Sequence, residues 1–304
     1  MNGVLVVDKP RGPTSHDVVA RVRRALGMSR VGHTGTLDPL ATGVLPLVIG
    51  RATRLAAMLS GADKEYDAGV RFGLATATYD AAGRTGAPPP APAGLDTARI
   101  EEALGRFRGT FSQMPPAYSA KKVGGVAAYT LARRNEAVEL QAVSVTVSRL
   151  ELLAYQDGLA RILVTATAGF YVRSLAHDLG QRLGCGAHLE SLRRSRAGMF
   201  GLADAVTLEE VEAEGRDAGQ RLVSLNRLLP QMPAAVLNER GAQRAAHGNT
   251  LGPSDFTGVQ ELPGTGEGDA VAPHRFRLMD GSGGLLGIAE TRPGGLLHPV
   301  IVLV

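Results

Sequence analysis

The most unusual part of the chain reads Gly32-His33-Thr34-Gly35-Thr36-Leu37-Asp38-Pro39-Leu40-Ala41-Thr42-Gly43-Val44-Leu45-Pro46. Three glycines and two prolines among its 15 residues impose a fixed, irregular backbone path directly before an apolar run that predicts a buried strand. A carboxylate held as rigidly as Asp38 can act as a nucleophile or a general base, and the His33 imidazole can pack on a planar ring. Because Asp-Pro also opens many ordinary turns, the spacing alone leaves a structural role open for both residues.

Short strands and helices follow one another on both sides of this loop. Apolar runs and capping residues predict strands at 3–7, 44–49, 65–72, 138–153 and 159–168, and helices at 15–26, 51–60, 96–107 and 169–183. Asp157-Gly158 predicts the turn between the last two strands. The strands are too many for a helical bundle and lack a regular βαβ order. The sequence therefore predicts an α+β fold with a mixed, largely antiparallel sheet and flanking helices.

The character of the sequence changes from about residue 230. One helix-like stretch at 238–247 is followed by short strands at 276–279, 285–290 and 300–304, which are separated by turns rich in glycine and proline. We therefore expect two domains, a larger body at 1–230 and a small β-rich domain at 231–304.

Charge is distributed unevenly along the 304 residues. Residues 1–200 hold 25 basic against 16 acidic side chains, whereas residues 201–304 hold 8 against 13. Arginine supplies 29 of the 33 basic residues, and a guanidinium grips phosphate oxygens two at a time. A GC-rich coding sequence also explains many arginines, so the asymmetry carries more weight than the count. It favours a polyanionic partner for the first 200 residues, nucleic acid before membrane.

Several classes of protein are excluded. The lone cysteine, Cys185, leaves no internal disulfide, no CxxC pair and no cysteine-rich zinc site. Phosphate-loop, dinucleotide, serine-hydrolase and HExxH motifs are absent, so we expect no cofactor and no metal. The longest charge-free runs have 12 residues, too short to cross a bilayer, and Asp8 and Lys9 do not suit a signal peptide. We expect a cytoplasmic protein without a membrane partner.

The run GHTGTLDPLATGVLPLVIGRATR at 32–54 closely resembles the signature of the bacterial tRNA pseudouridine synthases of the TruB type, which modify the T-loop uridine conventionally numbered 55. Four more stretches resemble motifs of that family, in the family's order: GVLVVDKPRGPTSHDVV at 3–19, DKEYDAGVRFG at 63–73, QMPPAYSAKKVGG at 113–125, and GFYVRSLAHDLGQRLGCGAHLESLRRSRAG at 169–198. Ordered motifs spread over 200 residues are far more specific than any one of them.

The resemblance implies a fold and a reaction. The fold is the pseudouridine synthase fold followed by a small PUA-like RNA-binding domain. The reaction breaks the N-glycosidic bond of uridine, rotates the detached uracil and rejoins it through C5 to the ribose C1′. Asp38 falls on the family's catalytic aspartate. One carboxylate suits this isomerisation, because it can stabilise an oxocarbenium-like sugar, attack it, or take a ribose proton without metal or redox partner.

The resemblance also assigns roles to residues that would be unremarkable alone. Tyr66 falls on the tyrosine that stacks on the target base, and Leu192 on a leucine that lines the base pocket. Arg173 falls on the arginine that pairs with the catalytic carboxylate and would hold Asp38 ionised. His33 matches the histidine that helps expose the target nucleotide by stacking where the base had been. Without the motifs, packing or solvated surface positions explain each of them.

Other positions have supporting roles by the same resemblance. Lys9 would shape the pocket floor or meet a phosphate, and Asp80 would position neighbouring groups. The insertion at about 75–136 would clasp the T-arm through Lys121, Lys122 and a helix with Arg133 and Arg134. The implied partner is the T-arm stem-loop of tRNA, bound by a monomer that needs no other protein.

The sequence departs from the family pattern in three places. Ala77 stands where a further aspartate is usual, which removes a hydrogen bond near Asp80. Val126 and Ala127 stand where basic residues are common, which weakens the expected grip on phosphate. The C-terminal residues match the PUA-like domain only loosely, and their acidic surplus argues against tight backbone binding there.

Two other functions remain open at this stage. An RNA-folding chaperone would have no use for the set Asp38, Tyr66 and Arg173, which disfavours it as the whole activity. A guide-RNA-dependent synthase would work with protein partners, and the long insertion disfavours it because the insertion resembles the part with which stand-alone enzymes hold their RNA.

Overall fold

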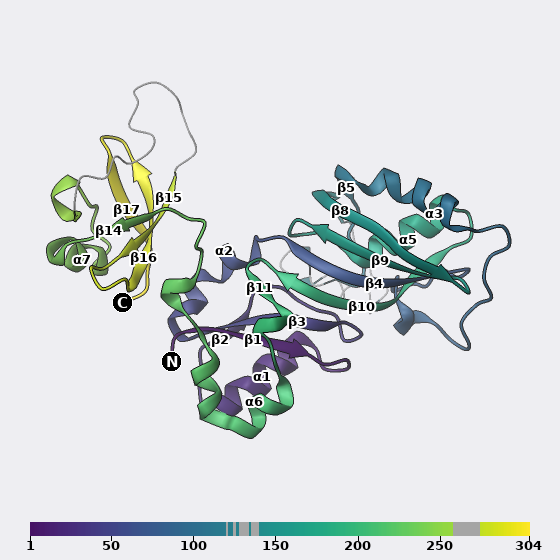
Figure 1. Cartoon of the computed structure of the whole chain (residues 1–304), viewed down its shortest axis with the longest axis horizontal. Helices are drawn as coiled ribbons and strands as arrows, with labels where there is room; N and C mark the ends of the chain where they lie inside the picture. The colour runs from purple at the N-terminus through teal and green to yellow at the C-terminus, as the bar shows by residue number, and fades with distance from the viewer. Residues whose placement is uncertain (120, 124–125, 128–133, 135–139, 258–273) are drawn as a thin grey trace.

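The computed structural model describes residues 1–304 apart from 120, 124–125, 128–133, 135–139 and 258–273. Within the described part, the strands form an 11-stranded sheet, a separate four-stranded sheet near the C-terminus and a two-stranded ribbon (Figure 1). The large sheet follows the order β12-β1-β3-β10-β4-β9-β8-β5, with β2, β11 and β13 attached at its side. Its strands are β1 (Gly3–Lys9), β2 (Val31–His33), β3 (Thr42–Ile49), β4 (Lys64–Phe72), β5 (Gly109–Gln113), β8 (Val143–Gln156), β9 (Leu159–Ala166), β10 (Ala187–Ala197), β11 (Phe200–Gly201), β12 (Val206–Thr207) and β13 (Val223–Ser224).

Neighbouring strands of the large sheet run antiparallel except at two places. β1 lies parallel to β12, and β3 lies parallel to β10. The sheet is therefore mixed and largely antiparallel, and the predicted α+β class is confirmed. The ribbon consists of β6 (Lys122–Val123) and β7 (Val126–Ala127).

Alternation along β1 explains how one strand serves two cores. Leu5 and Val7 belong to the main hydrophobic cluster, whereas Val4 and Val6 belong to a second cluster on the opposite face. Successive side chains of a strand point to opposite faces, so a continuous apolar run marks a strand that is covered on both sides. β3 repeats the pattern, which makes these two strands the most deeply buried part of the sheet.

Helices on the main-cluster face form where the sequence supplies caps and helical apolar spacing. Thr14 and Asp17 form a capping box at the start of α1 (Ser15–Leu26), and Gly27 ends that helix in the left-handed conformation. Asp96 caps the next long helix through the backbone N–H of Arg99, 2.9 Å away. Residues of four helices enter the main cluster: α1, α3 (Thr97–Leu104), α5 (Val172–Arg182) and α6 (Leu208–Glu214).

Most predicted elements are present, with shifted ends. The hairpin between β8 and β9 turns at Asp157-Gly158, where both residues have positive φ. The helix predicted to run to residue 107 ends at Leu104 and continues as a short 3-10 helix, and the predicted helix at 51–60 is a 3-10 turn followed by α2 (Ala56–Ser60). The predicted start of β8 at residue 138 lies outside the described residues, and the described strand begins at Val143.

One central strand was not predicted. β10 lies between β3 and β4 and carries the sequence Ala187–Ala197, whose arginines and glutamate hide its alternation. Leu192 and Arg194 share one face of this strand and are both buried, so a charged side chain occupies a position that an apolar one would normally fill.

The C-terminal unit packs its own core and also contacts the large sheet. Its sheet has the order β14 (Ala234–Val236), β15 (Arg275–Met279), β16 (Leu285–Arg292) and β17 (Leu296–Val302), with α7 (Glu239–Ala246) against it. β17 begins at Leu296 and not at the predicted residue 300. Leu285, Ile288 and Leu303 join the second cluster with Val4 and Val44 of the large sheet. The Arg54 guanidinium also donates to the carbonyl oxygen of Val302.

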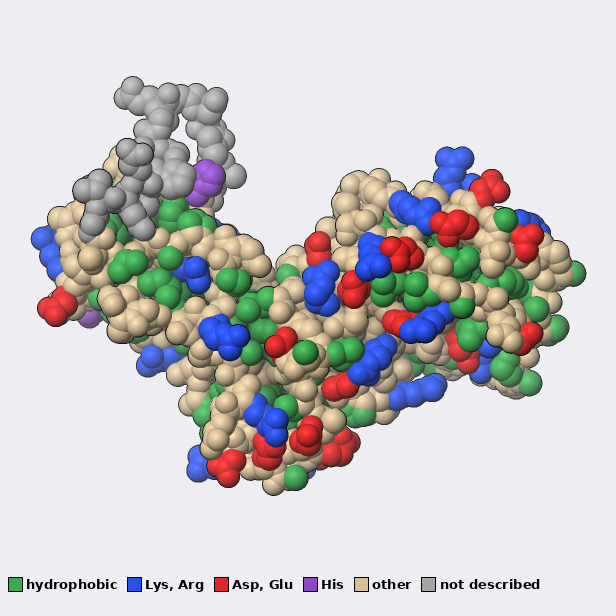
Figure 2. All heavy atoms as spheres, in the orientation of Figure 1, with side chains coloured by type: hydrophobic (Ala, Val, Ile, Leu, Met, Phe, Trp, Pro, Cys, Tyr) green, Lys and Arg blue, Asp and Glu red, His purple; other side chains and the backbone are tan. Residues whose placement is uncertain are grey.

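The acidic surplus of residues 201–304 is placed differently from the prediction. Acidic side chains gather over α6, at the lower end of the molecule in Figure 2, within the body that carries the large sheet. Glu212 and Glu214 there pair with Arg21 and Arg221. Residues 231–304 hold only seven acidic against five basic side chains, so the C-terminal unit itself is nearly balanced.

Substitution of Ile288 tests the shared cluster. Ile288→Ala leaves a cavity in a site with 0 % exposure and is expected to lower the free energy of unfolding by about 2–5 kcal/mol, measured by denaturant unfolding. Val300→Ala, on the exposed side of β17, is the control and should cost less than about 0.5 kcal/mol. Equal stability of the two variants would contradict the packing described.

Candidate active site

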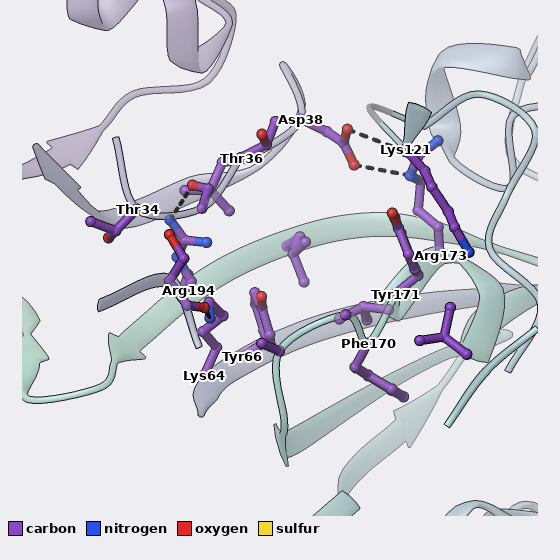
Figure 3. Close-up of a pocket in the computed structure, with 18 residues that line it drawn as sticks. Thr34, Thr36, Asp38, Lys64, Tyr66, Lys121, Phe170, Tyr171, Arg173 and Arg194 are labelled. Carbon is purple, nitrogen blue, oxygen red and sulfur yellow. Dashed lines mark hydrogen bonds and ion pairs between the residues drawn. The ribbon is translucent and has the colours of Figure 1, made fainter. Parts of the chain in front are cut away.

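A cavity of about 470 Å³ opens where the Thr34–Asp38 loop meets β4, β10 and the start of α5 (Figure 3). Both cations and apolar side chains line it, and they come from segments that are far apart in the sequence. The charged, aromatic and apolar residues in its lining include Asp38, Lys64, Tyr66, Lys121, Phe170, Tyr171, Arg173, Leu192 and Arg194.

The loop that carries Asp38 is held at several points. The Ser15 hydroxyl accepts the N–H of Leu37 at 2.8 Å and donates to the Leu37 carbonyl oxygen at 3.0 Å. Gly43 has φ of +100°, and a Cβ there would lie 2.2 Å from the backbone oxygen of Arg194. Only glycine allows β3 to approach β10 this closely, which brings Asp38 to the same cavity as Leu192.

Asp38 forms an ion pair with Arg173 across the cavity. The Arg173 Nε lies 2.9 Å from Oδ2, and Nη2 donates to Oδ1 at 3.2 Å, as the dashed lines of Figure 3 show. Arg173 is only 6 % exposed at its side chain, whereas Asp38 is 33 % exposed. The pairing therefore leaves the carboxylate accessible from the cavity while its partner is buried.

Other groups fix the Arg173 guanidinium in place. Nη2 donates to the carbonyl oxygen of Tyr118 at 2.8 Å, and Nη1 donates to that of Thr78 at 3.1 Å. Asp80 lies behind it, with Oδ2 at 3.8 Å from Nη1. The Asp80 carboxylate is in turn bound by the Thr78 hydroxyl at 2.6 Å and the Ala82 N–H at 3.0 Å. Asp80 thus lies on the far side of Arg173 from Asp38, and its positioning role stays a prediction.

Burial and charge act in opposite directions on Asp38. Desolvation by the surrounding residues raises the pKa of Asp38 above its ordinary value, and the Arg173 charge acts to lower it. Asp80 adds a smaller upward effect and Lys9 a smaller downward one. A carboxylate in this setting is more basic than one in water, which suits a group that must accept a proton or donate an electron pair.

Tyr66, Leu192 and Arg194 form one wall of the cavity. Tyr66 and Leu192 are each 8 % exposed. Arg194 is 1 % exposed, and its Nε donates to the Val44 carbonyl oxygen at 2.7 Å. Its Nη2 also donates to the Gly35 carbonyl oxygen at 3.2 Å.

Two buried lysines lie close to this wall. Lys9 is fully buried and donates from Nζ to the carbonyl oxygens of Ala41 at 2.7 Å and Pro10 at 3.0 Å, so it supports the Asp38 loop from below. Lys64 donates to the Ser60 and Ala62 carbonyl oxygens at 2.8 and 2.6 Å. Desolvation lowers the pKa of both ammonium groups to about 8.

His33 lies on β2 and does not line the cavity, although Thr34 beside it does. Its Nδ1 accepts the Gly35 N–H at 3.3 Å, and its ring meets that of His16 edge-on at a centroid distance of 5.4 Å. Burial lowers the pKa of His33, so the ring is neutral at physiological pH. His33 is therefore a neutral, partly exposed imidazole next to the Thr34–Asp38 loop.

Only some of the residues predicted to hold the RNA lie in the part of the chain that the structure describes. Lys121 lines the cavity and donates from Nζ to the Gln141 carbonyl oxygen at 2.8 Å. In the ribbon, Lys122 pairs with Ala127 and Val123 with Val126 through their backbones, but the side chain of Lys122 lies outside the described residues, as does Arg133. Ala77, where the family usually has an aspartate, is exposed.

The sequence reasoning missed several members of the site. Arg194 stands two residues after Leu192, and the period of a strand could have placed both on one face. The same argument could have placed Lys64 beside Tyr66 on β4, whereas Tyr171 precedes helix α5 and no strand period applies to it. Among the described residues, His, Cys, Asp and Glu side chains form no group of three or more that could hold a metal ion.

The architecture is the pseudouridine synthase fold. A chain in the solved structure of an H/ACA RNP bound to a substrate RNA containing 2'-deoxyuridine aligns with a TM-score of 0.72 at 23% identity, over 99% of this chain and 85% of that chain. An archaeal box H/ACA Nop10-Cbf5 complex aligns with a TM-score of 0.71 at 24% identity, over 99% and 86%.

Sequence relationships give the family. Residues 23–172 match the N-terminal domain of TruB family pseudouridylate synthases, and residues 173–236 match the tRNA pseudouridylate synthase B C-terminal domain. Proteins called tRNA pseudouridine synthase B are 46% identical in Solibacter usitatus, over 100% of both chains, and 41% identical in Pseudomonas aeruginosa, over 98% of this chain and 95% of that one. The chain belongs to the TruB family of pseudouridylate synthases, and it is therefore an enzyme of the isomerase class.

Replacing Arg173 tests the electrostatics of the site directly. Arg173→Met removes the charge that lowers the pKa of Asp38, so that pKa is expected to rise further above the ordinary value. Carbon-13 NMR of labelled aspartate carboxyls, with Asp38→Asn used to assign the signal, measures it. A pKa that stays unchanged or falls would show that Arg173 does not control the ionisation of Asp38.

Proposed function

We propose that this protein converts the T-loop uridine of tRNA, at position 55, to pseudouridine, with Asp38 as its catalytic carboxylate. The observation that carries the proposal is the accessible Asp38 carboxylate, paired with buried Arg173 in a cavity whose wall is Tyr66 and Leu192. The names of the relatives, tRNA pseudouridine synthase B, support tRNA as the substrate.

The cavity suits each stage of the reaction. The uracil ring would stack on Tyr66 and contact Leu192, and the ribose would face Asp38. When the C1′–N1 bond breaks, its electron pair leaves with uracil, and Asp38 stabilises or attacks the electron-poor C1′, or takes the C2′ proton. C5 then bonds to C1′ and releases its proton. Every step rearranges bonds within one nucleotide, so no co-substrate is consumed.

Access to the base requires that it leave the RNA stack. We place His33 at the rim, where its neutral ring takes the position of the displaced base and offsets part of an unstacking cost of a few kcal/mol.

Lys121, Lys122 and the segment around 75–136 would hold the T-arm backbone. Residues 231–304 form the RNA-binding PUA-like domain of this proposal, with residues 1–230 as the catalytic domain. No helix within the described ranges is long and apolar enough to cross a membrane, and we place the enzyme in the cytoplasm as a monomer.

The central test uses an unmodified T-arm stem-loop, without guide RNA, partner protein or added metal. The full chain should form pseudouridine at one loop uridine, and Asp38→Asn should reduce turnover at least about 10³-fold because the reacting carboxylate is lost, with RNA affinity retained. Asp67→Asn, which removes a carboxylate paired with Arg161 on the sheet surface, is the matched control and should keep turnover. Product from Asp38→Asn at the parental rate would refute the assignment. A requirement for guide RNA would favour the guide-dependent alternative, and binding without product would favour the chaperone.

Salt dependence tests the phosphate grip. Lys121→Gln should weaken binding of the stem-loop and reduce the slope of log K against log salt by about 1, because one phosphate contact is lost. Arg221→Gln, next to Glu214 on the acidic side, should leave the slope unchanged. Equal slopes for the parent and Lys121→Gln would remove Lys121 from the interface.

A further inference from the structure

Tyr79 has a backbone conformation that its residue type rarely adopts. Its φ is +63°, in the left-handed region, where glycine and asparagine are at home and a tyrosine is strained. The backbone around it is tied down: its N–H donates to the Thr76 carbonyl oxygen at 3.1 Å, and its own carbonyl oxygen accepts the Leu189 N–H at 2.9 Å. Strain of this kind persists only where the surroundings enforce it.

The Tyr79 ring stacks face to face on His177. Their ring centroids are 3.8 Å apart and the planes differ by 11°. His177 lies on α5, one helical turn beyond Arg173. Its Nδ1 is buried and has no hydrogen-bond partner among the described residues, so this nitrogen does not set the orientation of the ring. The stack covers one face of the ring and joins the Thr76–Asp80 segment to the helix that carries Arg173.

Both neighbours of Tyr79 serve the Arg173 guanidinium. Thr78 supplies the carbonyl oxygen that accepts from Nη1, and Asp80 supplies the carboxylate behind it. A segment bearing these two groups must stay at a fixed distance from α5, because hydrogen bonds weaken steeply when their geometry changes. Tyr79 lies between Thr78 and Asp80 in the sequence, so its stack on His177 spans the same distance between this segment and α5 as their two contacts with Arg173 do.

We propose that the Tyr79–His177 stack is a positioning device for the Asp38–Arg173 pair. It holds the strained Thr78–Asp80 backbone against α5, and this backbone holds the guanidinium in the plane that meets the Asp38 carboxylate. The inference rests on the proposed role of Asp38 for its catalytic readout, and on the geometry alone for its effect on Asp38 ionisation. Tyr79 and His177 do not line the cavity, so they act through Arg173 and not on the substrate.

The expected change in Asp38 ionisation has a definite sign. The charged groups that act on Asp38 are Arg173 from α5, Asp80 from the strained segment and Lys9 from β1. Releasing the segment weakens the downward effect of Arg173 and the upward effect of Asp80. Because the effect of Arg173 is the larger, the pKa of Asp38 should rise. The acid limb of kcat/KM should therefore move to higher pH.

The variants are chosen to separate the ring from the backbone. Tyr79→Asn removes the ring but accepts the left-handed φ, whereas Tyr79→Phe keeps the ring and removes only the hydroxyl. His177→Ala removes the other half of the stack, and His177→Phe retains an aromatic face. Full-length variants are assayed with the T-arm stem-loop across pH, and the Asp38 carboxyl is titrated by carbon-13 NMR.

Tyr79→Asn and His177→Ala should each lower kcat about tenfold with little change in KM, and the double variant should lose no more than either single one, because both break the same contact. Both should raise the pKa of Asp38, and the two phenylalanine variants should behave like the parent. Unchanged kcat and an unchanged Asp38 pKa in Tyr79→Asn would overturn the proposal, even if that variant is less stable.

Failure of the stack and failure of the proposed function give different results. If Asp38→Asn keeps full turnover, the catalytic assignment fails, and the NMR titration still decides whether the stack controls the Asp38–Arg173 pair. If Asp38→Asn is inactive while Tyr79→Asn matches the parent in rate and titration, only the stack proposal fails.

Discussion

The buried charge of Arg173 is the constraint on which the site depends. A guanidinium that is 6 % exposed must be neutralised and hydrogen-bonded, because an unpaired charge is very costly in a protein interior. Carboxylates and carbonyl oxygens from three separate segments meet this need: the Asp38 loop, the Thr78–Asp80 segment and the stretch that contains Tyr118. The cation thus organises loops that have no regular structure of their own, and the cavity forms where they converge.

Much of this arrangement could be predicted from the sequence. Continuous apolar runs mark β1 and β3, because strands buried on both faces need no polar positions, and the caps Thr14 and Asp96 locate their helices. The family resemblance then named Asp38, Tyr66, Arg173 and Leu192, and the structure brings all four to one cavity. It also shows Asp80 behind the ion pair and Lys9 beneath the loop.

The features that the sequence did not predict depend on tertiary contacts, which local sequence patterns do not reveal. β10 has the sequence of a polar segment because it carries three arginines, whose partners come from other parts of the chain: Arg194 donates to the carbonyl oxygens of Val44 and Gly35, and Arg193 pairs with Asp8. Likewise, no pattern in the sequence near Tyr79 indicates that its ring stacks on His177 of α5. The acidic surplus was assigned to the C-terminal unit because net charge was counted over residues 1–200 and 201–304, whereas four of the acidic residues lie on α6 of the larger body, where two of them pair with arginines.

The second hydrophobic cluster has a consequence for how the chain is made. Val4 and Val6 are translated long before Leu285, Ile288 and Leu303, the C-terminal side chains that share their cluster. The part of this apolar face that those three residues cover therefore stays open to solvent until the C-terminal unit has been made and has packed against the large sheet. A truncation before Leu285 would leave that apolar surface exposed to the proteases and chaperones of cellular quality control.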